Sequence, residues 1–209
     1  MTETVNPAPV TDATLPGDDF LVKAENQGKR HGIAGLVDTL YGLSLNRQNR
    51  ATLMGLRSVL SRPDIFSHEA VPVVAPFLPS ASSATDSRQR RREDMGRRNY
   101  YLIAGLFASW HINHRSDLEA DVKVFNLGHS LALLSQRQPT AGKALINDLT
   151  RMPVNQCTGL LMRIVQQLSQ ENIRINWYDL GYALTRPGNW RESQRKWAES
   201  YHRSASRKK

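Results

Sequence analysis

A pair of histidines comes first among the residues that could do chemistry. His111 and His114 have the H-x-x-H spacing that can place two imidazoles on one helical face, and Asp117 and Glu119 follow as potential carboxylate ligands. This pattern supports one hypothesis, a metal-dependent hydrolase. Because the same spacing is common in proteins without a metal, we favour solvated histidines near a helix end and expect no metal site.

Two further patterns resemble catalytic motifs but do not complete them. Ser193 and Lys196 have S-x-x-K spacing, yet the companion motifs of enzymes that use this nucleophile are missing. Gly142-Lys143 resembles the end of a phosphate-binding loop, but Ala144 stands where a Ser or Thr would bind magnesium. We therefore predict a protein without catalytic residues and without a cofactor.

Basic residues exceed acidic ones and are clustered. The chain has 28 Lys plus Arg against 19 Asp plus Glu, a formal net charge of +9, which favours polyanionic partners. Residues 29–62 hold six basic residues against one acid, 88–98 six against two, and 186–209 eight against two. Three separate clusters of this kind indicate a nucleic-acid-binding surface.

The candidate binding residues lie on predicted helices. At 100° per residue, Arg47, Arg50 and Arg57 fall in a narrow sector beside the apolar face of a helix expected over 47–61. The guanidinium group suits phosphate, so contact with the nucleic-acid backbone is expected rather than base readout. The full set assigned to nucleic acid is Arg47, Arg50, Arg57, Arg163, Arg191, Arg195 and Lys196.

Tryptophans offer a second way to bind nucleic acid, by stacking on bases. We expect Trp177 and Trp197 in the core. Trp190, beside Arg191 and after Pro187-Gly188, is the candidate for an exposed ring.

The elements that position these residues are predicted to be helices throughout, because apolar residues recur at three- and four-residue spacing and strand-like alternation is scarce. The expected order is a helix from 31 to about 43, a second over 47–61, a short or kinked one over 65–78, a mobile basic loop over 79–96, a strongly apolar helix over 97–110, a loop over 113–126, and helices over 127–137, 141–150, 157–170, 176–184 and 190–202.

This order predicts an all-α fold of two small helical bundles packed in tandem. The first covers residues 29–118 and the second residues 119–209, which end in a basic tail, while residues 1–28 form a flexible acidic tail. No signal peptide or membrane-spanning run is evident, and the single Cys157 cannot form an internal disulfide. We expect a cytoplasmic protein.

Four segments carry motifs that occur together in one protein family. Asn49 to Arg57 is similar to an R-A-x-L-x-x-L-R-R segment, although Ser58 replaces the final Arg, and Arg97 to Ala108 is similar to a Y-x-x-A-x-L-F-A helix. Asn126 to Leu131 resembles an L-G-x-x-L turn, and the tail, from Ile175 to Tyr201, resembles V-D-W-x-x-L, W and Q-x-x-W-A-x-x-Y. In this order the motifs resemble those of the CasB family, the small subunit of the type I-E CRISPR Cascade complex.

The resemblance implies a non-catalytic subunit that pairs with a second copy of itself and contacts the other Cascade subunits. It also implies contact with crRNA-guided target DNA and its displaced strand, so that the R-loop is stabilised, while a separately recruited nuclease-helicase cuts the DNA. Arg50 and Arg57 carry over by motif, and Arg191 by its place beside Trp190. The alternative is a helical scaffold whose basic surface binds an acidic protein partner.

Overall fold

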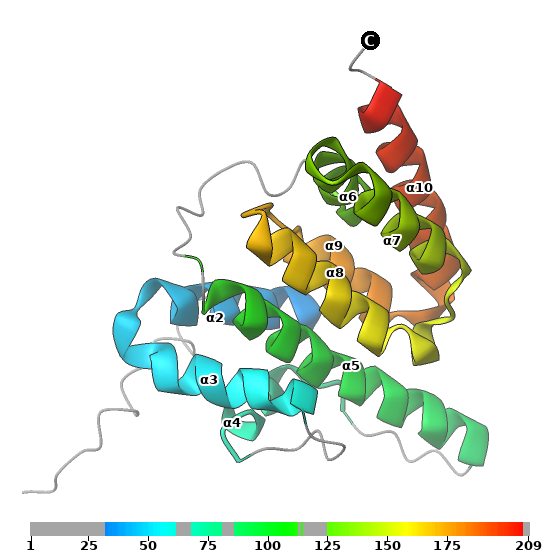
Figure 1. The fold of residues 1–209 in the computed structure, drawn as a ribbon. Coiled ribbons are helices and arrows are strands. Elements are labelled where there is room, and N and C mark those ends of the chain that lie inside the picture. Colours follow the sequence, from blue (N-terminus) through cyan, green and yellow to red (C-terminus); the bar gives the residue numbers. More distant parts are fainter. Residues whose placement is uncertain (1–31, 62–67, 81–85, 113, 115–124, 207–209) are drawn as a thin grey trace, which may run out of the picture. The chain divides into compact units, whose positions relative to one another are not determined.

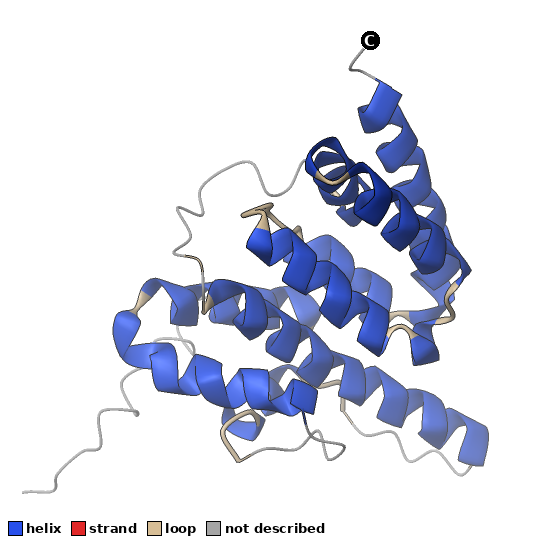
Figure 2. Ribbon diagram, in the orientation of Figure 1, coloured by secondary structure: helices blue, strands red, loops and turns tan. Residues whose placement is uncertain are grey.

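The computed structural model describes residues 32–61, 68–80, 86–112, 114 and 125–206, apart from the side chains of residues 92 and 187. The described residues form helices joined by short turns and contain no strand (Figure 2). The predicted all-α class is therefore confirmed. The predicted acidic tail, residues 1–28, lies outside the described residues, as does most of the predicted loop 113–126.

The α-helices follow the predicted order (Figure 1). They are α2 (Ile33–Leu45), α3 (Arg50–Ser58), α4 (Val71–Val74), α5 (Ser87–His111), α6 (Leu127–Arg137), α7 (Pro139–Arg151), α8 (Thr158–Gln170), α9 (Trp177–Thr185) and α10 (Trp190–Ser206). However, α5 begins ten residues earlier than predicted, and α4 is only four residues long. Short 3₁₀ helices flank them: η1 (Arg47–Asn49), η2 (Val59–Ser61), η3 (Ala75–Phe77), η5 (Val154–Gln156) and η6 (Pro187–Asn189).

The mobile basic loop predicted over 79–96 is wrong for its second half. Residues from Ser87 onward belong to α5, which begins at Asp86, where the side-chain carboxylate accepts a hydrogen bond from the Arg88 backbone N–H at 2.9 Å. Arg, Gln, Glu and Met are good helix formers, and each residue added to an existing helix gains one hydrogen bond. The apolar part of α5 thus anchors a helix that continues through the polar run.

The core surrounds the carboxyl-terminal half of α5. Residues 100–108 are all buried, and α5 packs against α2, α3, α8 and α9. Two long-range hydrogen bonds fix this helix: Asn99 Nδ2 donates to the Leu184 carbonyl at 2.7 Å, and Trp110 Nε1 donates to the Ile173 carbonyl at 3.2 Å. Since α5 lies at the centre, its exposed amino-terminal turns are held on a rigid support.

α6, α7 and α10 pack against one another. α6 packs closely on α10 and on α7, and α7 also contacts α10. α8 contacts α5 as well as α6 and α7, so residues 31–209 form one compact unit. The division into two bundles near residue 118 stays a prediction, because residues 115–124 lie outside the described part of the chain.

Candidate nucleic-acid interface

Three arginines form a basic ridge at η1 and α3, which we define as Arg47, Arg50 and Arg57. Each side chain is exposed, and none forms an ion pair with a carboxylate among the described residues. Arg50 and Arg57 are two turns apart on one helical face, roughly 10 Å along the axis, which is about three phosphate rises of a B-form strand. The ridge therefore presents unneutralised positive charge at a spacing that suits successive phosphates.

The helix is oriented by its opposite side. Leu53 and Leu56 are buried against α5, which leaves the arginines on the flank. Met54 lies on the same flank between Arg50 and Arg57 and is 50% exposed. This flank therefore also presents an apolar side chain, which a phosphate group would not contact favourably.

The basic residues of α10 are in a different electrostatic state. Lys196 Nζ lies 2.7 Å from Glu192 Oε1, and Arg195 Nε lies 3.6 Å from Glu199 Oε1, both pairs being one helical turn apart. The hydrogen bond from Lys196 lowers the pKa of Glu192. Because these exposed pairs neutralise the cations locally, α10 offers a polyanion less net charge than the ridge does.

The remaining two predicted residues are exposed. Arg163 lies on α8 and Arg191 at the start of α10, one helical turn before Arg195, and neither forms an ion pair within the described part of the chain. Neither is joined to the ridge by any hydrogen bond, ion pair or ring contact between described residues. The predicted set thus comprises one ridge on η1 and α3, the cations of α10, two of which pair with glutamates, and Arg163 on α8.

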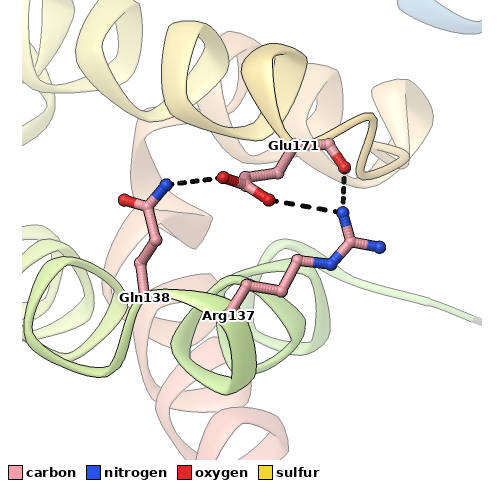
Figure 3. A network of polar contacts seen from close by, with 3 residues as sticks. All are labelled: Arg137, Gln138 and Glu171. Carbon is pink, nitrogen blue, oxygen red and sulfur yellow. Dashed lines mark hydrogen bonds and ion pairs between the residues drawn. The ribbon is translucent and has the colours of Figure 1, made fainter.

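Another arginine, Arg137, makes contacts within the fold and is not available to a ligand in the same way. Figure 3 shows Glu171, at the end of α8, between Arg137 and Gln138 at the junction of α6 and α7. Gln138 Nε2 donates to Glu171 Oε1 at 2.6 Å, and Arg137 Nη1 donates to the backbone carbonyl of Glu171 and lies 3.4 Å from its Oε2. This network ties two helix ends together and occupies the Arg137 guanidinium.

The expectation of a solvated His111 is wrong. His111 is 5% exposed, stacks on Phe107 and makes a hydrogen-bond contact between its Nδ1 and the Phe107 carbonyl oxygen at 3.0 Å. Burial lowers the pKa of His111 to about 4, so the ring is neutral at pH 7. His114 Nε2 instead contacts Ser169 Oγ at 2.8 Å. No group of three potential ligands occurs among the described residues; Asp117 and Glu119 lie outside them.

The other residues that could have taken part in catalysis make structural contacts instead. Cys157 is buried, its Sγ donates to the Val154 carbonyl, and burial raises the pKa of its thiol to about 11. Lys196 pairs with Glu192 rather than Ser193. Gly142-Lys143 lies within α7, not at a strand-to-helix loop. None of these described groups therefore has the surroundings of a nucleophile or a phosphate loop.

The expectation of an exposed Trp190 is wrong. Trp190 is 3% exposed, packs edge-on against Trp197 and donates from Nε1 to the Met152 carbonyl at 2.9 Å. Trp197 donates from Nε1 to Asp179 Oδ2 at 2.6 Å, and Trp177 is also buried. These rings hold α10 in the fold and offer no stacking platform.

The sequence model of CRISPR-associated protein Cse2 matches residues 52–202, nearly three quarters of the chain. The chain belongs to the Cse2 family. The resemblance to CasB, another name for this small subunit of type I-E Cascade, is thereby confirmed. No curated protein shows significant sequence similarity.

Solved structures share the fold of this Cse2-family chain. CasB from M. ruber is 23% identical, with a TM-score of 0.57, and the match covers 90% of this chain and 93% of that one. A Cse2-family protein from Thermus thermophilus is 21% identical, with a TM-score of 0.58 over 80% and 95% of the two chains. A chain of a CRISPR RNA-guided surveillance complex is 23% identical, with a TM-score of 0.60 over 90% and 96%.

The sequence pattern did not predict that the arginine cluster of residues 88–98 lies on a helix of this Cse2-family chain. Arg90 and Arg91 fall in the predicted loop, but they lie on α5, the same helix that carries Arg97 and Arg98. The signal that could have found them is Asp86, whose type and position suit a helix N-cap.

In the described part of the chain no helix is long and apolar enough to cross a membrane.

Proposed function

We propose that this Cse2-family chain is a non-catalytic subunit of a type I-E Cascade complex, in which it binds nucleic-acid backbone and stabilises the R-loop. In this proposal it contacts the other Cascade subunits and a second copy of itself. The crRNA pairs with the target strand, the other strand is displaced, and cutting belongs to a separately recruited nuclease-helicase. The match to a chain of an RNA-guided surveillance complex supports the association.

One observation carries the proposal. The basic ridge is exposed and has no carboxylate partner among the described residues, so none of those carboxylates neutralises its charge. Opening a duplex against a guide is nearly balanced in free energy, because the RNA–DNA pairs formed are about as stable as the DNA pairs lost. A few phosphate contacts are therefore enough to shift the yield of open complex.

The test is charge reversal of the ridge in the reconstituted complex. Arg50→Glu with Arg57→Glu should lower R-loop yield at physiological salt by about tenfold, equivalent to about 1.4 kcal/mol. It should also reduce the slope of log affinity against log salt by about 2, one for each lost phosphate contact. The matched control reverses Lys143 and Arg151, two exposed cations of α7, and should leave both quantities nearly unchanged.

The outcomes separate nucleic acid from a protein partner. An unchanged yield and slope in the ridge variant, with the complex intact by size-exclusion chromatography, would refute backbone binding at the ridge. If the ridge instead binds an acidic protein, the variant loses that protein from pull-downs, and nuclease digestion of the wild-type complex does not release it.

A further inference from the structure

A groove on α5, outside the residues assigned so far, has the size of a small-ligand site. It has a volume of about 470 Å³ and lies where α5 passes between the end of α3 and the start of α8 (Figure 1). Ligand pockets typically have about 300–1,000 Å³, mostly apolar walls and a few well-placed polar groups.

The described lining of the groove is mixed, with five apolar and six polar residues. Val59 and Leu60 come from η2, Val154 from η5, and Met95 and Leu102 from α5 between them. None of its described lining residues is aromatic. The apolar part of the lining, which we call the slot, is therefore built by three segments of the chain.

Polar groups sit at defined points of the groove. Asn99 is 6% exposed, and its Nδ2 donates to the Leu184 carbonyl, which fixes the orientation of the amide. Its Oδ1 accepts no hydrogen bond from a described residue, and Asn99 lines the groove. Asn155 and Thr158 add exposed donors and acceptors at the rim. Each of the common nucleobases carries an N–H group that Asn99 Oδ1 could accept.

The charge at the rim is positive. Arg91 and Arg98 lie two turns apart on the face of α5 that lines the groove, with Asp94 between them. Both arginines are exposed, and neither is paired with a carboxylate in the described part of the chain. Guanidinium groups suit phosphate, and a nucleotide brings phosphates for the two arginines together with an N–H donor for Asn99 Oδ1.

We propose that this groove binds one unstacked nucleotide of a single-stranded nucleic acid, with its base in the aliphatic slot and its flanking phosphates at Arg91 and Arg98. The inference rests on the proposed function and extends it from backbone contact to capture of a base. Bases in a duplex are stacked and paired and cannot enter the slot. The site therefore selects the displaced strand over either duplex.

The test uses 2-aminopurine, a fluorescent base that brightens when it leaves its stack. It is placed at successive positions of the displaced strand in R-loops formed by the reconstituted complex. Wild-type complex should raise the fluorescence at one position or a small set of positions, since no aromatic ring among the described lining residues can quench it. Thr158→Phe, at the exposed first turn of α8, should fill the mouth of the groove and reduce this rise at least fivefold.

The matched control is Thr140→Phe, the same change at the exposed first turn of α7. A second variant, Arg98→Gln, should weaken the fluorescence rise about threefold and in a salt-dependent manner, whereas Arg151→Gln on α7 should not. Arg98→Gln keeps the test decisive if Thr158→Phe impairs complex assembly.

The failure of this inference differs from failure of the proposed function. If R-loop yield depends on the basic ridge but the fluorescence pattern is the same in wild type, Thr158→Phe and Arg98→Gln, the groove does not hold a base. If charge reversal of the ridge leaves R-loop yield unchanged, the backbone proposal falls, whatever the groove variants show.

Discussion

The close packing of α6 on α10 makes Gly128→Ala a stringent test of the fold. A Cβ at Gly128 would lie 1.8 Å from the Trp197 carbonyl oxygen and 2.5 Å from its carbonyl carbon. The obstacle is backbone, so the two helices must move apart by about 1 Å or more to restore ordinary van der Waals separation. Trp197 is fully buried and its Nε1 is bonded to Asp179, so α10 cannot retreat without loosening that contact.

The expected loss follows from two opposing contributions. Overpacking of a core typically costs about 1–3 kcal/mol, and contact with backbone places Gly128→Ala at the upper end. The helical preference of Ala over Gly returns about 1 kcal/mol. The net loss in free energy of unfolding is about 2 kcal/mol, which lowers Tm by about 4–8 °C for a chain of this size.

The assay is thermal and urea unfolding followed by far-ultraviolet circular dichroism. Gly96→Ala is the matched control, because a Cβ at this position of α5 would meet no atom within 4 Å. It should stabilise the protein by about 0.5–1 kcal/mol through helix propensity alone. If Gly128→Ala is as stable as wild type or more stable, the contact between α6 and the Trp197 backbone is wrong.

Three further predictions concern single side chains. Burial lowers the pKa of His111 to about 4, so the unfolded chain binds the proton more tightly than the folded protein does. The free energy of unfolding should therefore be highest above pH 6.5 and fall by at most about 3 kcal/mol as the pH drops from 6.5 to below 4. Urea titrations at a series of pH values should show a smaller fall in His111→Phe. Asn126→Ala should cost about 1 kcal/mol in the same assay, because the Asn126 side chain accepts from the His129 backbone N–H at the start of α6. Cys157, buried and with its pKa raised to about 11, should react with Ellman's reagent only in denaturant; rapid reaction of the folded protein would contradict its burial.

Helix positions could be predicted from sequence where apolar periodicity is strong. The prediction failed where a helix is stabilised by its cap and by the packing of a neighbouring segment. The helix expected over 157–170 is observed as α8 over Thr158–Gln170, since its buried residues recur every three or four positions. The amino-terminal half of α5 has no such pattern. It is helical because Asp86 caps it and because its buried carboxyl-terminal half is already fixed.

Some features of the candidate interface could likewise be predicted from the sequence, and others could not. The exposure of Arg50 and Arg57 follows from helical geometry, and the pairing of Lys196 with Glu192 could be read from their four-residue spacing. The burial of Trp190 could not, because its partner Met152 lies 38 residues away and local sequence says nothing of such contacts. The groove on α5 depends on three segments meeting, and no single one reveals it.

The unpaired state of the basic ridge has a consequence for rates. Arg50 and Arg57 are about one Debye length apart at 0.1 M salt, so an approaching polyanion experiences them as one source of field. Charges of this kind mainly raise the frequency of productive encounters, whereas desolvated contacts set how long a complex lasts. Neutralising the ridge should therefore slow capture of a polyanion far more than it hastens release.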